Sequence, residues 1–167
     1  MPNDLKALIS IGGNLPGPGR KASIDMCRAA VSRLDLLPGI RLCGLSRWFL
    51  TAPVPPSGQP DYVNAVAALL VDTDPAVLLR QLMAIEAACG RVRGAPNAAR
   101  TVDLDIVAMG DLVRAAPDPI LPHPRAHERA FVLLPLLDVA PGWIHPALGQ
   151  TGRELLAALP PQGIRAL

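Results

Sequence analysis

The chain has 167 residues, half of them hydrophobic. Its 16 basic and 14 acidic residues give a net charge of +2, and only 3% of its residues are aromatic. So small a positive charge and so few aromatic residues argue against a nucleic-acid-binding protein. No apolar run approaches the roughly 20 residues that cross a membrane, and the sequence opens without a basic, apolar leader, so we expect one cytoplasmic domain over residues 1–167. The cysteines Cys27, Cys43 and Cys89 are odd in number and far apart, so we expect reduced thiols that pack as small hydrophobic residues.

Six segments have the pattern of regular structure. We expect strands at 5–12, 40–51, 61–73 and 102–109, and helices at 21–37 and 74–89, where Asp74 and Pro75 form a typical helix start. The order β-α-β-β-α-β predicts a ferredoxin-like α+β fold, an antiparallel sheet with helices packed on one face. A C-terminal extension from Leu112 is punctuated by prolines and ends in a predicted helix near 149–159.

The last predicted strand carries two acidic residues, Asp103 and Asp105. Residues two apart on a strand share a face at a spacing of about 7 Å, so the carboxylates repel each other unless water or a cation lies there. The preceding loop holds Arg91, Arg93 and Arg100 with no acidic residue between them. Carboxylates beside arginines suit Mg²⁺-dependent phosphoryl chemistry; solvation, or salt bridges to the same arginines, is the alternative. No P-loop motif is present.

Five stretches, in this order and at these spacings, resemble the 6-hydroxymethyl-7,8-dihydropterin pyrophosphokinase family of folate biosynthesis: IGGNL, QPDYVNAV, GRVR, RTVDLDI and LPHPRAHERAFVLLPL. The resemblance covers about Leu8 to Pro141. It implies an enzyme that transfers pyrophosphate from MgATP to the hydroxymethyl oxygen of the pterin and releases AMP. We also expect a monomer that binds small molecules, with no nucleic-acid or membrane partner.

The same resemblance assigns roles to individual residues. Asp103 and Asp105 would hold two Mg²⁺ ions that bridge the triphosphate, and Arg91 and Arg100 would neutralise charge on the β-phosphorus. The ATP site would also include Glu86, Arg93, His123 and Arg129. The pterin would lie among Thr51, Val54, Tyr62, Asn64 and Phe131, with Phe131 stacked on the ring and Asn64 bonded to its edge. We expect His127 and His145 to be surface residues.

Three positions depart from the family pattern. The loop between Arg93 and Arg100 reads GAPNAA, without the usual tryptophan; Met83 replaces a common glutamine; and Pro124 replaces an aromatic residue. We therefore predict an active enzyme with weaker or differently gated substrate binding.

Two alternatives to the pyrophosphokinase remain. A nucleotidyltransferase also uses D-x-D, but its Gly-Gly or Gly-Ser lies shortly before the aspartates, whereas Gly12 and Gly13 lie far upstream of Asp103. A degenerate paralogue would bind pterin or nucleotide without catalysis, as a sensor or partner module.

Overall fold

The structure, a computed structural model, describes residues 5–15, 22–53, 56, 58–90 and 101–167. Its elements in chain order are β1 (Leu5–Gly13), α1 (Ser23–Asp35), β2 (Ile40–Leu45), β3 (Phe49–Thr51), β4 (Tyr62–Val71), α2 (Pro75–Ala88), β5 (Asp103–Met109), the 3-10 helix η2 (Ala126–Glu128), α3 (Ala130–Val139), α4 (Gly152–Ala157) and β6 (Ile164–Ala166).

The strands form one antiparallel sheet in the order β5-β1-β4-β3-β6, and β2 also pairs with β4. The segment predicted as one strand over 40–51 is divided in two, and both parts, β2 and β3, lie along β4. At the break, the Ser46 hydroxyl accepts a hydrogen bond from the backbone N–H of Val66 at 2.9 Å. The α+β fold with helices packed on an antiparallel sheet is therefore confirmed.

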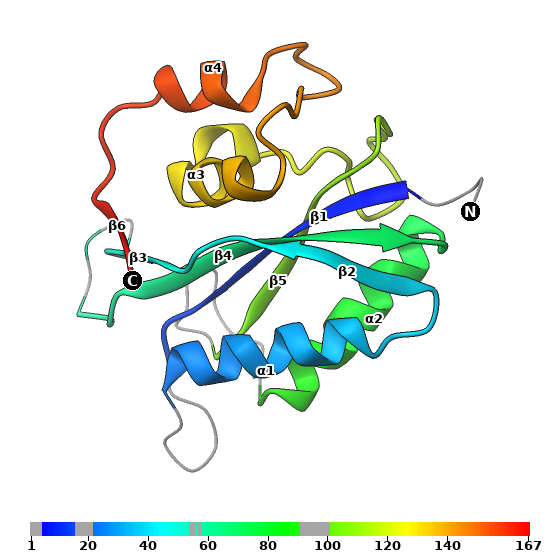
Figure 1. The fold of residues 1–167 in the computed structure, drawn as a ribbon, viewed down its shortest axis with the longest axis horizontal. Helices are drawn as coiled ribbons and strands as arrows, with labels where there is room; N and C mark the ends of the chain where they lie inside the picture. Colours follow the sequence, from blue (N-terminus) through cyan, green and yellow to red (C-terminus); the bar gives the residue numbers. More distant parts are fainter. Residues whose placement is uncertain (1–4, 16–21, 54–55, 57, 91–100) are drawn as a thin grey trace.

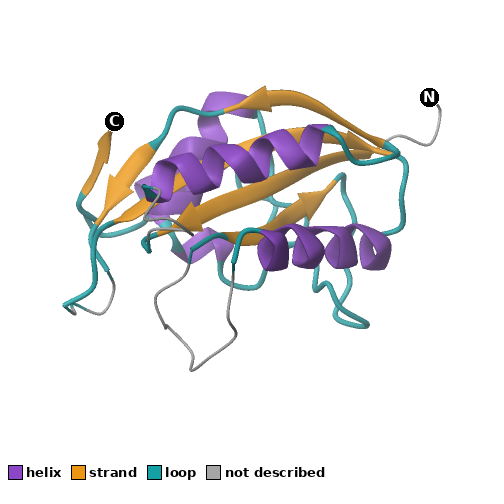
Figure 2. Ribbon diagram, turned by 90° about the horizontal axis from the view of Figure 1, so that it is seen from below, coloured by secondary structure: helices purple, strands orange, loops and turns teal. Residues whose placement is uncertain are grey.

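The sheet is covered by helices on both faces, not on one as expected. In Figure 1, α1 and α2 lie on one side of it and α3 and α4 on the other; Figure 2 shows α1 and α2 from their own side. One core lies between the sheet and the first pair, with Ile9, Leu69, Leu82 and Leu104 among its residues. The second core lies under α3 and includes Leu8, Val66, Val107, Val132 and Leu136. The C-terminal extension thus forms the helical layer on the second face of the sheet.

The ends of the helices follow local side-chain chemistry. Asp74 caps α2 by accepting a hydrogen bond from the backbone N–H of Ala76 at 3.0 Å, which confirms the predicted start. Thr151 and Glu154 form a reciprocal capping box at α4, which is shorter than predicted. None of the helices in the described part of the chain combines the length and apolarity needed to span a bilayer.

His145 is buried, with 4% of its surface exposed, so the expectation of a surface residue is wrong. Its Nδ1 accepts hydrogen bonds from the backbone N–H groups of Ala147 at 3.2 Å and Leu148 at 3.0 Å. The rings of His127 and Trp143 lie at its edges. Burial lowers the pKa of His145, and the nearby His127 lowers it further.

All three cysteines are free thiols, as expected, but only two are buried. Burial raises the pKa of Cys27 to about 12, so this thiol is inert. Cys43 is exposed on β2, against the expectation that it packs in the core.

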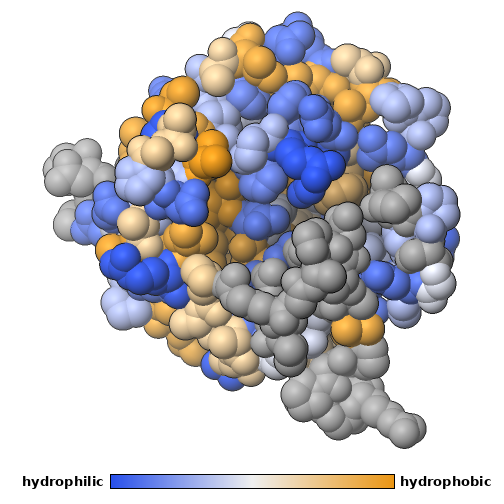
Figure 3. Space-filling model, turned by 180° about the vertical axis from the view of Figure 1, so that it is seen from behind, coloured by the Kyte–Doolittle hydropathy of each residue, from blue (hydrophilic) through white to orange (hydrophobic). Residues whose placement is uncertain are grey.

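Seen from behind, the molecule gathers hydrophilic residues near the centre of one face beside a band of hydrophobic ones (Figure 3).

Candidate active site

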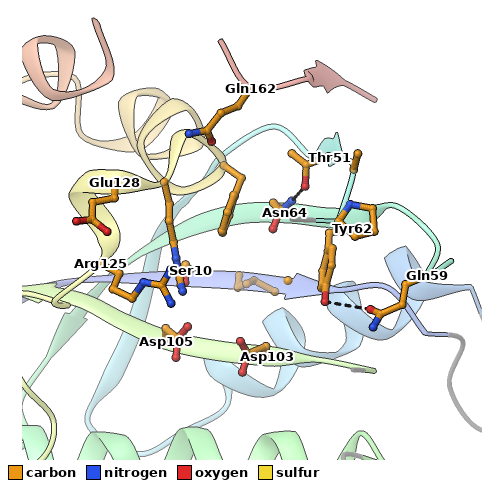
Figure 4. A pocket seen from close by; sticks show the side chains of 16 residues that line it. Ser10, Thr51, Gln59, Tyr62, Asn64, Asp103, Asp105, Arg125, Glu128 and Gln162 are labelled. Atoms are coloured by element: carbon orange, nitrogen blue, oxygen red, sulfur yellow. Dashed lines mark hydrogen bonds between the residues drawn. The ribbon is translucent and has the colours of Figure 1, made fainter. Parts of the chain in front are cut away.

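A cavity of about 470 Å³ lies between one face of the sheet and the start of α3 (Figure 4). It is large enough for a small-molecule ligand. Its walls come from β1, β3, β4, β5, the η2–α3 junction and the segment before β6. The lining residues are Ser10, Ile11, Gly12, Thr51, Ala52, Pro53, Gln59, Tyr62, Asn64, Asp103, Asp105, Arg125, Glu128, Arg129, Phe131 and Gln162.

Asp103 and Asp105 project from β5 into this cavity, on the same face of the sheet. They pair with Gly12 and Ser10 of β1, while Leu104 between them points into the opposite core. Both side chains are half-buried. The strand alternation predicted from the sequence is therefore confirmed, and the carboxylates share a cavity wall with water access.

A buried carboxylate from α2 holds the backbone between the two aspartates. Glu86 is 4% exposed, and its Oε2 accepts a hydrogen bond from the backbone N–H of Leu104 at 2.9 Å. This bond ties α2 to the one position of β5 that separates Asp103 from Asp105. Glu86 lies beneath the strand rather than among the residues that line the cavity.

His123 lies beside Asp105 in a fixed tautomer. Its Nδ1 accepts a hydrogen bond from the backbone N–H of Arg125 at 3.1 Å, so Nε2 carries the proton of the neutral ring, 4.0 Å from Asp105 Oδ2. Burial and the charge of Arg129 lower the pKa of His123 to about 4, although Asp103 opposes the shift. The imidazole is therefore neutral near pH 7, and its contact with Asp105 is not an ion pair.

The other end of the cavity combines flat apolar surfaces with a fixed amide. Asn64 Nδ2 donates a hydrogen bond to Thr51 Oγ1 at 2.8 Å. Tyr62 lies two residues away on the same face, as predicted, and Phe131 lines the cavity from α3. The guanidinium carbon of Arg129 lies 5.5 Å from the centre of the Phe131 ring. Such a site suits a planar, polar-edged heterocycle.

Two side chains to which the sequence analysis gave no role, Asn14 and Gln59, connect the loop before β4 to this end of the cavity. Gln59 Oε1 accepts hydrogen bonds from Asn14 Nδ2 at 3.0 Å and from the Tyr62 hydroxyl at 3.5 Å. Asn14 Nδ2 also donates to the carbonyl of Pro60 at 3.2 Å. Both residues lie in stretches that resemble the family, but the contact between Asn14 and Gln59 joins positions 45 apart in the sequence, so local spacing does not predict it.

The structure brings most of the expected site residues to the cavity. Those that line it are Thr51, Tyr62, Asn64, Asp103, Asp105, Arg129 and Phe131. His123 lies next to Asp105 and Glu86 behind β5. The predictions for Val54, Arg91, Arg93 and Arg100 fall outside the described residues. Further lining residues to which the sequence analysis assigned no role are Ser10, Gly12, Gln59, Arg125, Glu128 and Gln162.

Comparisons with known proteins identify the family. A family model for 7,8-dihydro-6-hydroxymethylpterin-pyrophosphokinase (HPPK) matches residues 8–141. The chain belongs to the HPPK family. It is accordingly an ATP-dependent pyrophosphokinase, a transferase of folate biosynthesis.

Curated relatives of this HPPK cover nearly its whole length. A Pseudomonas aeruginosa protein is 39% identical over 162 residues, which are 97% of this chain and 96% of the relative. A Synechocystis protein is 37% identical over 150 residues, 90% of this chain and 74% of the relative. Both are named 2-amino-4-hydroxy-6-hydroxymethyldihydropteridine pyrophosphokinase.

Solved structures share the HPPK fold. The crystal structure of wild-type Plasmodium falciparum HPPK-DHPS superimposes with a TM-score of 0.69 over 92% of this chain, at 13% sequence identity. This chain spans 44% of the Plasmodium chain. At that identity the likeness concerns the fold alone.

Proposed function

We propose that Asp103 and Asp105 form the metal site of this pyrophosphokinase, which transfers pyrophosphate from ATP to the hydroxymethyl group of 6-hydroxymethyl-7,8-dihydropterin. The observation that carries the proposal is the presence of both carboxylates on one wall of a cavity whose other end holds Tyr62, Phe131 and a fixed Asn64 amide. The charged end of the cavity suits ATP, and the end with the aromatic rings and the amide suits the pterin.

The aspartate pair fits Mg²⁺. Its oxygens are hard ligands, and the half-buried side chains face a cavity with room for phosphates. In the described residues no group of three or more His, Cys, Asp or Glu could hold a metal. Mg²⁺ needs only one or two carboxylates, because phosphates and water complete its octahedral shell. Two bound ions would supply charge neutralisation for the triphosphate.

The cationic residues of the cavity favour the nucleotide. Arg125 and Arg129 line it on the α3 side, and guanidinium groups bind phosphate oxygens as forked donors. The neutral His123 offers an N–H at Nε2 to the same region. We assign Arg91, Arg93 and Arg100 to the same nucleotide site on the family resemblance.

The apolar end of the cavity favours the pterin. Tyr62 and Phe131 provide ring surfaces for stacking. Thr51 fixes the Asn64 amide, so its orientation is set before the ligand arrives. A preorganised amide loses less entropy on binding than a mobile one. Val54 belongs to this end on the family resemblance.

We further propose that residues 1–167 act as one domain and as a monomer in the cytoplasm, binding two Mg²⁺ ions and small molecules only. The free thiols support a reducing compartment.

One assay tests the proposed reaction. The protein is incubated with MgATP and 6-hydroxymethyl-7,8-dihydropterin, and the nucleotide product is identified. AMP with pterin pyrophosphate supports the proposal, while ADP would indicate an ordinary kinase and free pyrophosphate a nucleotidyl transfer. Absence of turnover, with pterin still bound, would indicate a binding module.

A further inference from the structure

Gln162 connects the segment before β6 to the start of α3. Its Oε1 accepts a hydrogen bond from the backbone N–H of Ala130 at 3.1 Å, across 32 positions of sequence. Because the backbone group is a donor, the side-chain atom that faces it must be the oxygen, which fixes the orientation of the amide. Figure 4 shows this side chain reaching from its segment toward α3.

This hydrogen bond gives an acceptor to a backbone N–H group in the first turn of α3. The first N–H groups of a helix have no acceptor within it. Arg129 occupies the N-cap of α3, and an arginine side chain contains donors but no acceptor. Gln162 therefore supplies, from a distant segment, the cap that the local sequence of α3 does not.

The capped residue lies between two side chains of the candidate site. Ala130 separates Arg129 from Phe131, and both line the cavity, as does Gln162 itself. The segment that carries Gln162 is held in turn by β6, in which Ile164 pairs with Thr51 of β3. One short segment thus links the Thr51 wall of the cavity to the Phe131 wall.

We propose that Gln162 is a positioning residue for the pterin: by holding the N-terminus of α3, it sets the place of the Phe131 ring relative to Thr51 and Asn64. The inference rests on the proposed pterin site. Gln162 acts through the Ala130 backbone and not by touching the substrate, so its acceptor oxygen matters and its amide NH₂ group does not.

Two substitutions distinguish the role of the Gln162 acceptor oxygen from that of its NH₂ group. Gln162→Met keeps the length of the side chain and removes the acceptor, whereas Gln162→Glu keeps an acceptor and removes the NH₂ group. Loss of one hydrogen bond should raise the dissociation constant of the pterin about fivefold in the Met variant. The Glu variant should remain within about twofold of the unchanged enzyme, because a carboxylate is a good partner for a helix N-terminus.

The measurement is calorimetric titration of the dihydropterin into enzyme saturated with Mg²⁺ and a non-hydrolysable ATP analogue. Gln150→Met, at an exposed position, is the matched control and should bind as the unchanged enzyme does. Thermal unfolding of each variant reports stability separately. A lowered melting temperature with unchanged pterin affinity in Gln162→Met would make the bond purely structural and overturn the proposal.

Two further results have distinct meanings. If Gln162→Glu loses as much affinity as Gln162→Met, the NH₂ group contacts the ligand and the positioning role is wrong. Phe131→Ala and Asn64→Ala test the site on which the inference rests. If both bind the pterin normally, the proposed pterin site fails; if they weaken binding while Gln162→Met does not, only the positioning role fails.

Discussion

The backbone N–H of Leu104 lies 2.9 Å from the buried Glu86 carboxylate, so α2 is fastened to β5 at the residue between the two aspartates. Glu86→Ala would leave this buried donor unpaired and should lower the free energy of unfolding by about 1–3 kcal/mol. Glu86→Gln keeps an acceptor and should cost less. Urea denaturation of both variants measures the difference, and equal losses would show that the Leu104 bond contributes little.

The aspartate pair should be needed for catalysis more than for folding. Asp103→Ala removes a proposed metal ligand and should reduce AMP formation about a hundredfold or more, in line with the loss of a major electrostatic group. Because Asp103 is half-buried and faces a like charge, its removal should change the free energy of unfolding by less than about 1 kcal/mol. Asp111→Ala, an exposed neighbour on the following turn, should have normal activity; a fall there would make the Asp103 result non-specific.

Gly12 leaves space for the Asn64 amide. A Cβ at this position would lie 3.1 Å from Asn64 Oδ1, closer than ordinary contact. Gly12→Ala should therefore displace the amide that Thr51 holds and raise the KM for the pterin severalfold. Gly142→Ala, where a Cβ meets nothing within 4 Å, is the matched control. Steady-state kinetics with a constant pterin KM in Gly12→Ala would show that the amide adapts without loss.

Acid should destabilise the protein partly through His145. Burial lowers the pKa of His145 below its ordinary 6.5, so the unfolded chain binds its proton at a higher pH than the folded chain does. The free energy of unfolding should therefore fall as the pH drops below about 6.5, and above that value His145 should have no effect. Denaturant unfolding at pH 7.5 and pH 5 measures this loss.

His145→Asn is the matched variant, because its amide oxygen can accept the bonds from Ala147 and Leu148 without titrating. The loss on acidification should be smaller in this variant. An identical loss would assign the acid sensitivity to groups other than His145.

The loop without a tryptophan should limit pterin affinity. Ala98→Trp restores an aromatic residue to the GAPNAA stretch, at a position outside the described residues. A stacking contact of about 1 kcal/mol would lower the dissociation constant of the pterin about fivefold. Calorimetric titration in the presence of an ATP analogue checks this, and unchanged affinity would remove the reason for expecting weaker binding.

The elements around the first core could be predicted because each has a clear local signal. α1 and α2 show the helical spacing that a single buried face produces. β1, β4 and β5 are short, mostly apolar runs that contribute residues to both cores, as expected for strands covered on both faces. α3 could not, since its sequence AFVLLPLLDV is apolar except for Asp138 and contains Pro135. That helix lies between the sheet and α4, so no polar face marks its period. β6 has only three residues and is defined by its pairing with β3.

In the candidate site, too, only the features that follow from local sequence patterns could be predicted. Asp103 with Asp105, and Tyr62 with Asn64, could be placed on shared faces because strand alternation is a local rule. The contacts of Gln59 with Asn14 and of Gln162 with Ala130 could not, because these partners lie 45 and 32 positions away in the sequence.

The alternation of β5 also limits how the sequence can change in evolution. Loss of one residue between Asp103 and Ile106, where the pairing with β1 is regular, would put aspartate and apolar side chains on the wrong faces of the sheet, so chemistry and folding would fail together. Single substitutions at Asp103 or Asp105, by contrast, leave the interior untouched. Descendants of this sequence can therefore lose activity while keeping the fold, but we expect them to keep neither if they lose a residue between Asp103 and Ile106.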